Sequence, residues 1–147
     1  MIFIIGYGNP LRSDDGIGIF VANCLSQKNL TGIKIMTAHQ LHVEFLDEAV
    51  RYKATILIDA SSQQEDVSFR KIESSGYSQI PSTRHLTPEL FFELGKAVYG
   101  KDLNLYLCSL KGECFEIGHI FSDLAYQRAQ KAIEQIYSFV QGDLIHA

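Results

Sequence analysis

Short apolar runs alternate with segments of helical periodicity along this chain, and this alternation restricts its fold more than any other feature. The runs Ile2–Ile5 and ATILID (54–59) are almost wholly apolar, which is typical of strands buried on both faces of a parallel sheet. Further strands are expected at IKIMTA (33–38), VSFRKI (67–72) and LNLYLCSL (103–110). The alternating pattern of VSFRKI indicates a strand with one solvated face, at an edge of the sheet.

Helices are expected between these strands. Ser13 or Asp14 is a candidate N-cap for the first helix. Thr87 precedes a helix with Pro88 at its first position, and Gly100 follows its end. The four expected helices cover 17–25, Val43–Tyr52, 88–99 and 122–141. Strands that alternate with helices predict an α/β fold, a three-layer αβα sandwich around a doubly wound, mostly parallel sheet that allows an antiparallel edge strand.

Composition narrows the classes of partner. The 147 residues are expected to form a single domain, 1–147, and 46% of them are hydrophobic. The net charge of -4 argues against nucleic acid or an anionic membrane as a partner, because both require a basic surface. The three cysteines have neither disulfide nor zinc spacing, and the apolar start MIFIIG lacks the features of a signal peptide. These features favour a cytoplasmic protein that binds a small molecule or another protein.

The first loop, GYGNPLRSDDGIG (6–18), combines glycines with two carboxylates. A dinucleotide-binding loop would have glycine where this chain has Leu11, and Asp14 and Asp15 would repel a pyrophosphate. One alternative is that the two aspartates only complement the dipole of the following helix. The other is that the loop binds a cation, since a helix N-terminus keeps a carboxylate ionised.

Asp59 ends a buried strand on the same carboxyl edge of the predicted sheet, so it can meet Asp15. A carboxylate there is desolvated unless its charge is compensated. It is either a cation ligand or a cap on the next loop through Ser61 or Ser62. His85 follows another loop that can reach this edge, although a lone histidine is more often a surface residue. The pair in HQLH (39–42) has one-turn spacing but lacks the glutamate of a zincin helix, and ranks below the aspartates.

At this point the sequence resembles a known family. GYGNPLRSDDGIG is similar to the N-terminal signature of the hydrogenase maturation proteases, which cleave the C-terminal extension from the large subunit of nickel-iron hydrogenases. The same order continues with the aspartate in ILIDAS, the histidine in STRHLTPE and a last strand that leads to LKGECFEIG.

The resemblance implies an activity and a set of site residues. It implies an endopeptidase whose partner is a hydrogenase large-subunit precursor and which recognises nickel in that precursor, with no permanent cofactor. Metal-contacting and catalytic positions of the family correspond to Asp15, Asp59 and His85. Two carboxylates and an imidazole suit Ni²⁺, and three protein ligands leave positions for substrate. The remaining candidates bind substrate: Gly6 and Gly8 through close backbone approach, Asn9 as a hydrogen-bond donor, and His39 and Gln40 as contacts for selectivity.

Three departures accompany the resemblance. Asp15 stands where relatives often have glutamate, and Arg84 stands where many have proline or a small residue. HQL (39–41) replaces an acidic, glycine and threonine segment and is similar to the proteases that serve bidirectional, NAD-reducing hydrogenases. Two other readings remain open: a non-catalytic nickel or precursor-binding chaperone with the same fold, and a nucleotide-binding α/β enzyme.

Overall fold

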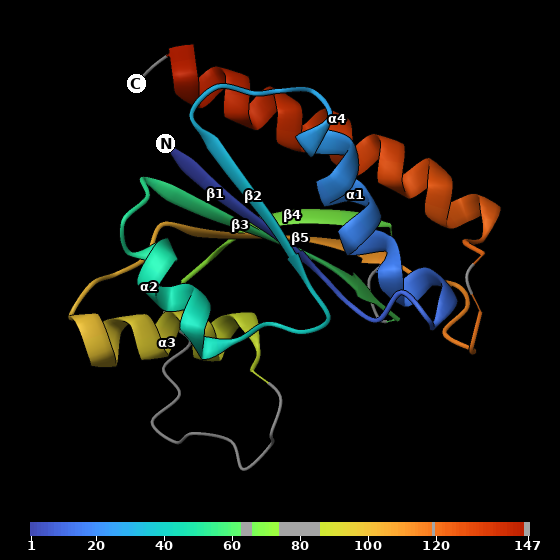
Figure 1. The fold of residues 1–147 in the computed structure, drawn as a ribbon, viewed down its shortest axis with the longest axis horizontal. Helices are drawn as coiled ribbons and strands as arrows, with labels where there is room; N and C mark the ends of the chain where they lie inside the picture. Colours follow the sequence, from blue (N-terminus) through green and yellow to red (C-terminus); the bar gives the residue numbers. More distant parts are fainter. Residues whose placement is uncertain (63–65, 74–85, 119, 146–147) are drawn as a thin grey trace.

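The computed structural model describes residues 1–62, 66–73, 86–118 and 120–145. Its strands are β1 (Ile2–Tyr7), β2 (Ile33–Ala38), β3 (Ala54–Ser61), β4 (Val67–Ile72) and β5 (Leu105–Lys111). They form a five-stranded sheet in the order β2-β1-β3-β5-β4 (Figure 1). All neighbours pair in parallel except β4, which is antiparallel to β5 at one edge. The predicted α/β fold, including the antiparallel edge strand, is therefore confirmed.

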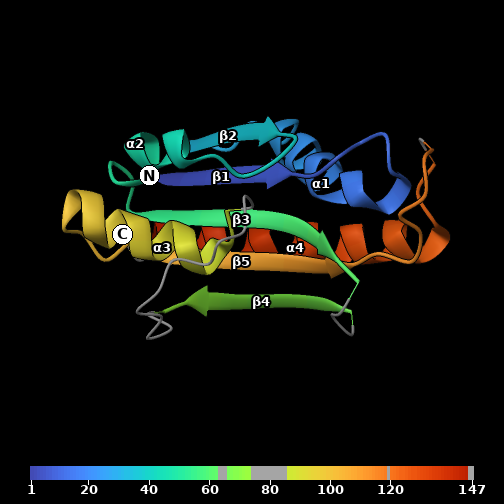
Figure 2. The same ribbon diagram turned by 90° about the horizontal axis from the view of Figure 1, so that it is seen from below.

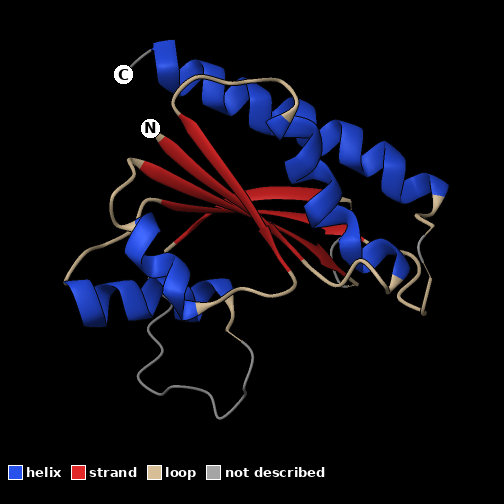
Figure 3. Ribbon diagram, in the orientation of Figure 1, coloured by secondary structure: helices blue, strands red, loops and turns tan. Residues whose placement is uncertain are grey.

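Helices follow the strands in the expected order (Figure 3). The α-helices are α1 (Ile17–Ser26), α2 (Leu46–Ala49), α3 (Pro88–Tyr99) and α4 (Asp123–Ile145), with 3-10 turns at Ser13–Gly16 and Val43–Phe45. The ends of α3 are those that the sequence predicts. The Thr87 hydroxyl accepts a hydrogen bond from the Leu90 amide at 3.1 Å, and Gly100 ends the helix with a φ of 64°. Glycine is favoured in this left-handed conformation because it has no Cβ to clash with the backbone.

The second helix is shorter than the sequence predicts. Instead of one helix over Val43–Tyr52, a 3-10 turn leads into the four-residue α2. The Tyr52 amide then bonds to the Ala49 carbonyl at 3.3 Å, in the tighter i to i−3 pattern. The Tyr52 ring stacks on Phe3 of β1, with ring centroids 5.3 Å apart. This contact draws the chain toward β3 and overrides the helical periodicity.

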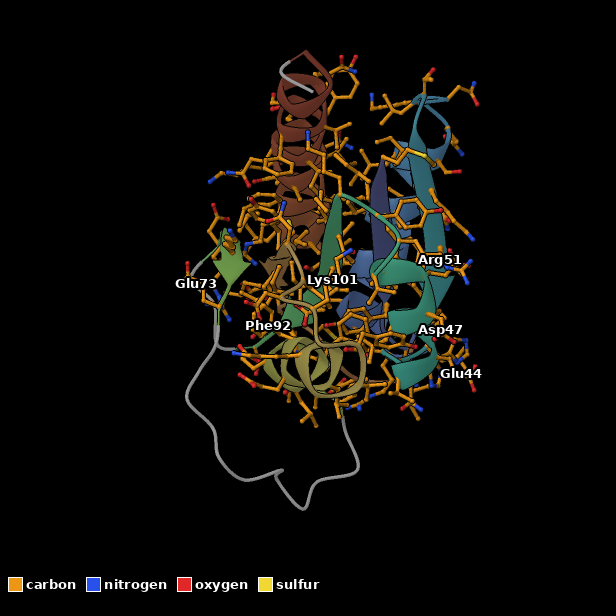
Figure 4. The ribbon with its side chains drawn as sticks, turned by 90° about the vertical axis from the view of Figure 1, so that its left-hand side faces the viewer. Glu44, Asp47, Arg51, Glu73, Phe92 and Lys101 are labelled. Atoms are coloured by element: carbon orange, nitrogen blue, oxygen red, sulfur yellow. The ribbon has the colours of Figure 1, made fainter. Side chains whose placement is uncertain are left out.

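The sheet is covered on both faces, by α1 and α4 on one side and by α2 and α3 on the other (Figure 1). Alternate residues of β1 serve the two layers: Ile2 and Ile4 pack with α1 and α4, and Phe3 and Ile5 pack with α2 and α3. The Tyr99 hydroxyl donates a hydrogen bond to Asp47 of α2, on the side of the molecule that Figure 4 faces. None of the helices described is both long and apolar enough to cross a membrane.

The strand order determines where a binding site can form. β1 lies between β2 and β3, so the chain leads from β1 to β2 on one side and then crosses to β3 on the other side of β1. The carboxyl ends of the four parallel strands meet at one end of the molecule (Figure 2). Sheets of this kind bind ligands in the crevice that opens at such a reversal of strand order.

Candidate active site at the carboxyl edge of the sheet

A pocket of about 720 Å³ opens at this edge. Four stretches of the described chain contribute its walls: the end of β1 with the first loop, the segment after β2, the end of β3, and the residue before the α3 cap. The lining residues are Tyr7, Gly8, Asn9, Asp15, His39, Gln40, Leu41, His42, Val43, Asp59, Ala60 and Leu86. The predicted meeting of Asp15 and Asp59 at the carboxyl edge is confirmed by the pocket that they share.

Of these two aspartates, Asp59 has the more unusual environment. It pairs in register with Ser109 of β5, and its Oδ2 accepts a hydrogen bond from the Tyr7 hydroxyl at 3.0 Å. Its Oδ1 is buried without a hydrogen-bond partner among the described residues. Burial raises the pKa of Asp59 to about 6, the Ser109 and Tyr7 hydroxyls oppose this shift, and the carboxylates of Glu89 and Asp15 add to it. A buried carboxylate oxygen without a donor costs free energy unless a ligand compensates it.

Asp15 is held by the loop that precedes it. Its Oδ2 accepts a hydrogen bond from the Asn9 amide at 2.8 Å, and the Asn9 side chain accepts one from the Leu11 amide at 2.9 Å. Gly8 has a φ of 148°, and a Cβ at this position would lie 1.9 Å from the Asp15 carbonyl oxygen. Glycine is therefore required at position 8 for the loop to close over Asp15.

Asp14, the neighbour of Asp15, is fully buried and turned away from the pocket lining. Its carboxylate accepts four hydrogen bonds: from the amides of Glu113, Cys114 and Ser122, at 2.7, 3.1 and 2.9 Å, and from the Ser122 hydroxyl at 2.8 Å. Burial acts to raise the pKa of Asp14, but these hydrogen bonds outweigh it and hold the pKa below its ordinary value. Asp14 thus fastens the segment after β5 to the first loop.

The expectation that Ser13 or Asp14 caps the first helix is wrong. The N-cap of α1 is Gly16, which offers no side-chain hydrogen bond. Ser13 donates its hydroxyl to the Glu116 carbonyl at 2.9 Å, and Asp14 is saturated by donors of the segment after β5. Both side chains instead form hydrogen bonds with residues about 100 positions away in the sequence, which no local pattern predicts.

Gly6 has a packing role away from the pocket that it was expected to line. A Cβ at Gly6 would lie 2.3 Å from the Gly18 carbonyl oxygen and 2.6 Å from the Ala22 Cβ. Gly6 therefore lets α1 lie directly against β1. Of the two glycines expected to approach a substrate, only Gly8 lines the pocket.

Of the three histidines considered as site residues, two lie within the described residues and one does not. His39 and His42 line the pocket together with Gln40, and the His42 ring lies 5.8 Å from the Phe45 ring, centroid to centroid. His85 lies outside the described residues, so its expected role as a ligand stays a prediction. Within the described part of the chain, no three histidine, cysteine, aspartate or glutamate side chains are grouped closely enough to hold a metal ion.

Tyr7 is the site residue that the sequence analysis missed. A signal was present: Tyr7 directly follows the buried residues of β1 at the carboxyl edge, as Asp59 directly follows those of β3. Burial and the Asp59 carboxylate raise the pKa of Tyr7 well above its ordinary value, so the phenol stays protonated and donates. The apolar part of the lining was also not expected from the sequence; it consists of Leu41, Val43, Ala60 and Leu86.

No model of a protein family matches the sequence, and no curated protein matches it. Solved structures match it over most of its length. The maturation protease HybD from Thermococcus kodakarensis is 20% identical, with a TM-score of 0.74 and coverage of 94% of this chain and 97% of that one. HycI from the same organism is 22% identical, with a TM-score of 0.74 and coverage of 95% and 92%. HybD from E. coli is 17% identical, with a TM-score of 0.76 and coverage of 97% and 93%. At these identities the likeness shows that the chain has the fold of these [NiFe] hydrogenase maturation proteases.

Proposed function

We propose that this protein is an endopeptidase that removes the C-terminal extension from the nickel-loaded large-subunit precursor of a nickel-iron hydrogenase. The observation that carries the proposal is the pocket shared by Asp15 and Asp59, in which Asp59 Oδ1 is buried and no described residue donates a hydrogen bond to it. Two further observations support it: the fold is that of solved hydrogenase maturation proteases, and the first-loop sequence resembles theirs.

Nickel enters this proposal as part of the substrate, because it arrives in the precursor. The donors present fit it: Ni²⁺ accepts carboxylate oxygens as ligands, and Asp59 Oδ1 is a buried acceptor to which none of the residues described donates a hydrogen bond. We propose Asp15, Asp59 and His85 as the ligands that share the metal with the precursor. No permanent cofactor is proposed.

The residues of this chain have separate tasks in the hydrolysis. The Tyr7 hydroxyl holds Asp59 through Oδ2, and the Asn9 amide holds Asp15 through Oδ2, so both carboxylates are oriented before the precursor binds. With a pKa of about 6, Asp59 is mostly ionised at neutral pH, as a ligand or a base must be. The precursor's nickel supplies Lewis-acid polarisation of the scissile carbonyl or of a water. Water adds to the carbonyl carbon, the C–N bond breaks, and the amine leaves with a proton.

The test is incubation with a nickel-loaded precursor, followed by measurement of the precursor's mass. We expect loss of the C-terminal extension with the unmodified protein. Asp59→Asn and Asp15→Asn should reduce the rate by a factor of about 100 or more, since each removes a charge in the pocket. Asp102→Asn is the matched control, because that side chain is 73% exposed and lies outside the pocket.

A precursor of unchanged mass would contradict the proposal. If the protein bound the loaded precursor without shortening it, the non-catalytic chaperone function would replace the protease function. We also propose that the precursor belongs to a bidirectional, NAD-reducing hydrogenase, on the resemblance of residues 39–41.

A further inference from the structure

Three aliphatic side chains are exposed on two connections at the end of the sheet where the pocket opens. Ile117 and Ile120, on the segment between β5 and α4, are 93% and 83% exposed, and Leu11, on the first loop, is 53% exposed. Single exposed aliphatic residues are common on proteins, but several from two adjoining segments mark a surface that contacts a partner.

Hydrogen bonds hold the two segments together. The Gly118 amide donates to the Leu11 carbonyl at 2.8 Å, and the Ser13 amide donates to the Gly118 carbonyl at 2.9 Å. The Arg12 Nε donates to the Phe115 carbonyl at 3.0 Å. The buried Asp14 carboxylate fastens both ends of the same segment from below, through the Glu113 and Ser122 amides. Because these hydrogen bonds already hold Leu11, Phe115 and Gly118 in place, a partner would order little of this part of the surface on binding.

The first-loop part of this surface adjoins the pocket. The connection between β1 and α1 and the connection between β5 and α4 lie at the same end of the sheet (Figure 2). Leu11 is two positions beyond Asn9, which lines the pocket and accepts a hydrogen bond from the Leu11 amide. Any protein that places a terminal tail in the pocket must therefore rest its folded part on the surface around this end.

We infer that Leu11, Ile117 and Ile120 form a docking surface for the folded part of the protein whose C-terminal tail enters the pocket. The inference rests on the proposed function. The partner contributes an apolar patch next to the origin of its tail, and the pocket receives the tail. Docking here governs how tightly the precursor binds, and the carboxylates govern its cleavage.

The experiment compares Ile117→Ser and Ile120→Ser with Val98→Ser. Val98 is 63% exposed in the last turn of α3 and is the matched control. Binding of the nickel-loaded precursor is measured by calorimetry, and cleavage is measured on the same precursor and on a short peptide that spans the cleavage site. We expect each Ile variant to bind the precursor roughly tenfold more weakly or worse, as loss of a central interface side chain does. KM for the precursor should rise with kcat unchanged, the peptide should be cleaved as by the unmodified protein, and Val98→Ser should change nothing.

Unchanged precursor binding by both Ile variants would overturn the inference. So would a shift from dimer to monomer in Ile117→Ser with precursor binding intact, because the surface would then join two copies of this chain. Failure of the proposed function is distinguishable: the unmodified protein would bind the precursor without cleaving it, and the calorimetric comparison would still decide the docking surface. If the unmodified protein did not bind the precursor, the docking surface would be overturned as well.

Discussion

At the scale of single residues, the buried Asp59 carboxylate, which we propose as a metal ligand, destabilises the folded state when it is ionised. Its pKa is raised from 3.8 to about 6, so the folded state binds more protons than the unfolded state between these values. Stability from this group is therefore fully present below pH 3.8 and is lost as the pH rises to about 6.

Asp59→Asn should consequently stabilise the protein at pH 7.5. We expect the free energy of unfolding to rise by about 1–3 kcal/mol, because the variant removes a buried charge while keeping the side-chain volume. The measurement is urea denaturation at pH 7.5 and again near pH 3.8, where the gain should vanish. An equal gain at both pH values would contradict the assignment of the effect to the charge.

The same titration predicts the acid side of the activity profile. Protonated Asp59 neither binds a cation nor accepts a proton, so processing of the precursor should slow about tenfold per pH unit below about 6. Rates are measured between pH 5 and 8, and recovery of the full rate on return to pH 7.5 excludes irreversible unfolding. A rate that stays flat across this range would show that ionisation of Asp59 is not required.

Asp14 should behave in the opposite way to Asp59. Asp14→Asn replaces an acceptor of four hydrogen bonds with an amide that cannot accept them all, and we expect a loss of about 2–4 kcal/mol in unfolding free energy at pH 7. The pKa of Asp14 is lowered, so its stabilisation is present above its ordinary pKa and is lost as the pH falls. The loss on substitution should therefore shrink in acid. The free energy is measured by denaturation, with Asp102→Asn as the control.

The contrast between Asp14 and Asp15 shows what the sequence can reveal about single residues. The meeting of Asp15 and Asp59 follows from strand direction alone, because Asp15 follows β1 and Asp59 lies near the end of β3, and both strands end at the carboxyl edge. The roles of Asp14 and Tyr7 depend on partners 108 and 52 positions away, Ser122 and Asp59, and no local pattern specifies such pairs.

At the scale of elements, β1 and β3 were predictable because a strand buried on both faces is almost wholly apolar, and β4 was predictable from the alternation that is typical of an edge strand. The α3 helix was equally predictable, since the Thr87 cap and Gly100 act locally. The short α2 was not predictable, because the packing of Tyr52 on Phe3 ends its periodicity. The close approach of α1 to β1 was also hidden, because a glycine gives no sign of which neighbour needs its small size.

Because α1 packs so closely on β1, one added methyl group at Gly6 should strongly reduce the free energy of unfolding. Gly6→Ala places a Cβ 2.3 Å from the Gly18 carbonyl oxygen, a backbone atom that cannot move without shifting α1. We expect a loss of about 3 kcal/mol in unfolding free energy, measured by urea denaturation. Gly142→Ala is the matched control: no atom lies within 4 Å of a Cβ there, and alanine in a helix is neutral or stabilising by up to about 1 kcal/mol. Equal stability of the two variants would contradict the packing role of Gly6.

At the scale of the whole molecule, one end of the sheet gathers three kinds of surface. It holds the carboxylates of the pocket, the polar segment after β2, and the exposed aliphatic side chains of the docking surface. Because these surfaces come from separate stretches of the chain, the loops that we propose to select the precursor can vary without changing the proposed catalytic carboxylates.

The segment after β2 is where we expect this selection. His39 and Gln40 line the pocket beside Asp15 and Asp59, so they can contact a bound tail without binding the metal. A precursor that matches them keeps its hydrogen bonds, whereas a mismatched one leaves buried polar groups unpaired, at about 1–3 kcal/mol each. Two such mismatches would reduce binding by a factor of about 30 or more.

We therefore predict processing of a bidirectional, NAD-reducing type of large-subunit precursor and not of an uptake type. The measurement is side-by-side digestion of both nickel-loaded precursors, with their masses followed over time. His39→Asp combined with Gln40→Gly, which introduces the acidic and glycine residues of other relatives, should weaken the preference by slowing cleavage of the first precursor. Val43→Ala, in the same lining but without a polar group, is the control for the loss of a side chain from this segment. Equal cleavage of both precursors by the unmodified protein would contradict the prediction, because the pocket wall formed by residues 39–40 would then discriminate nothing.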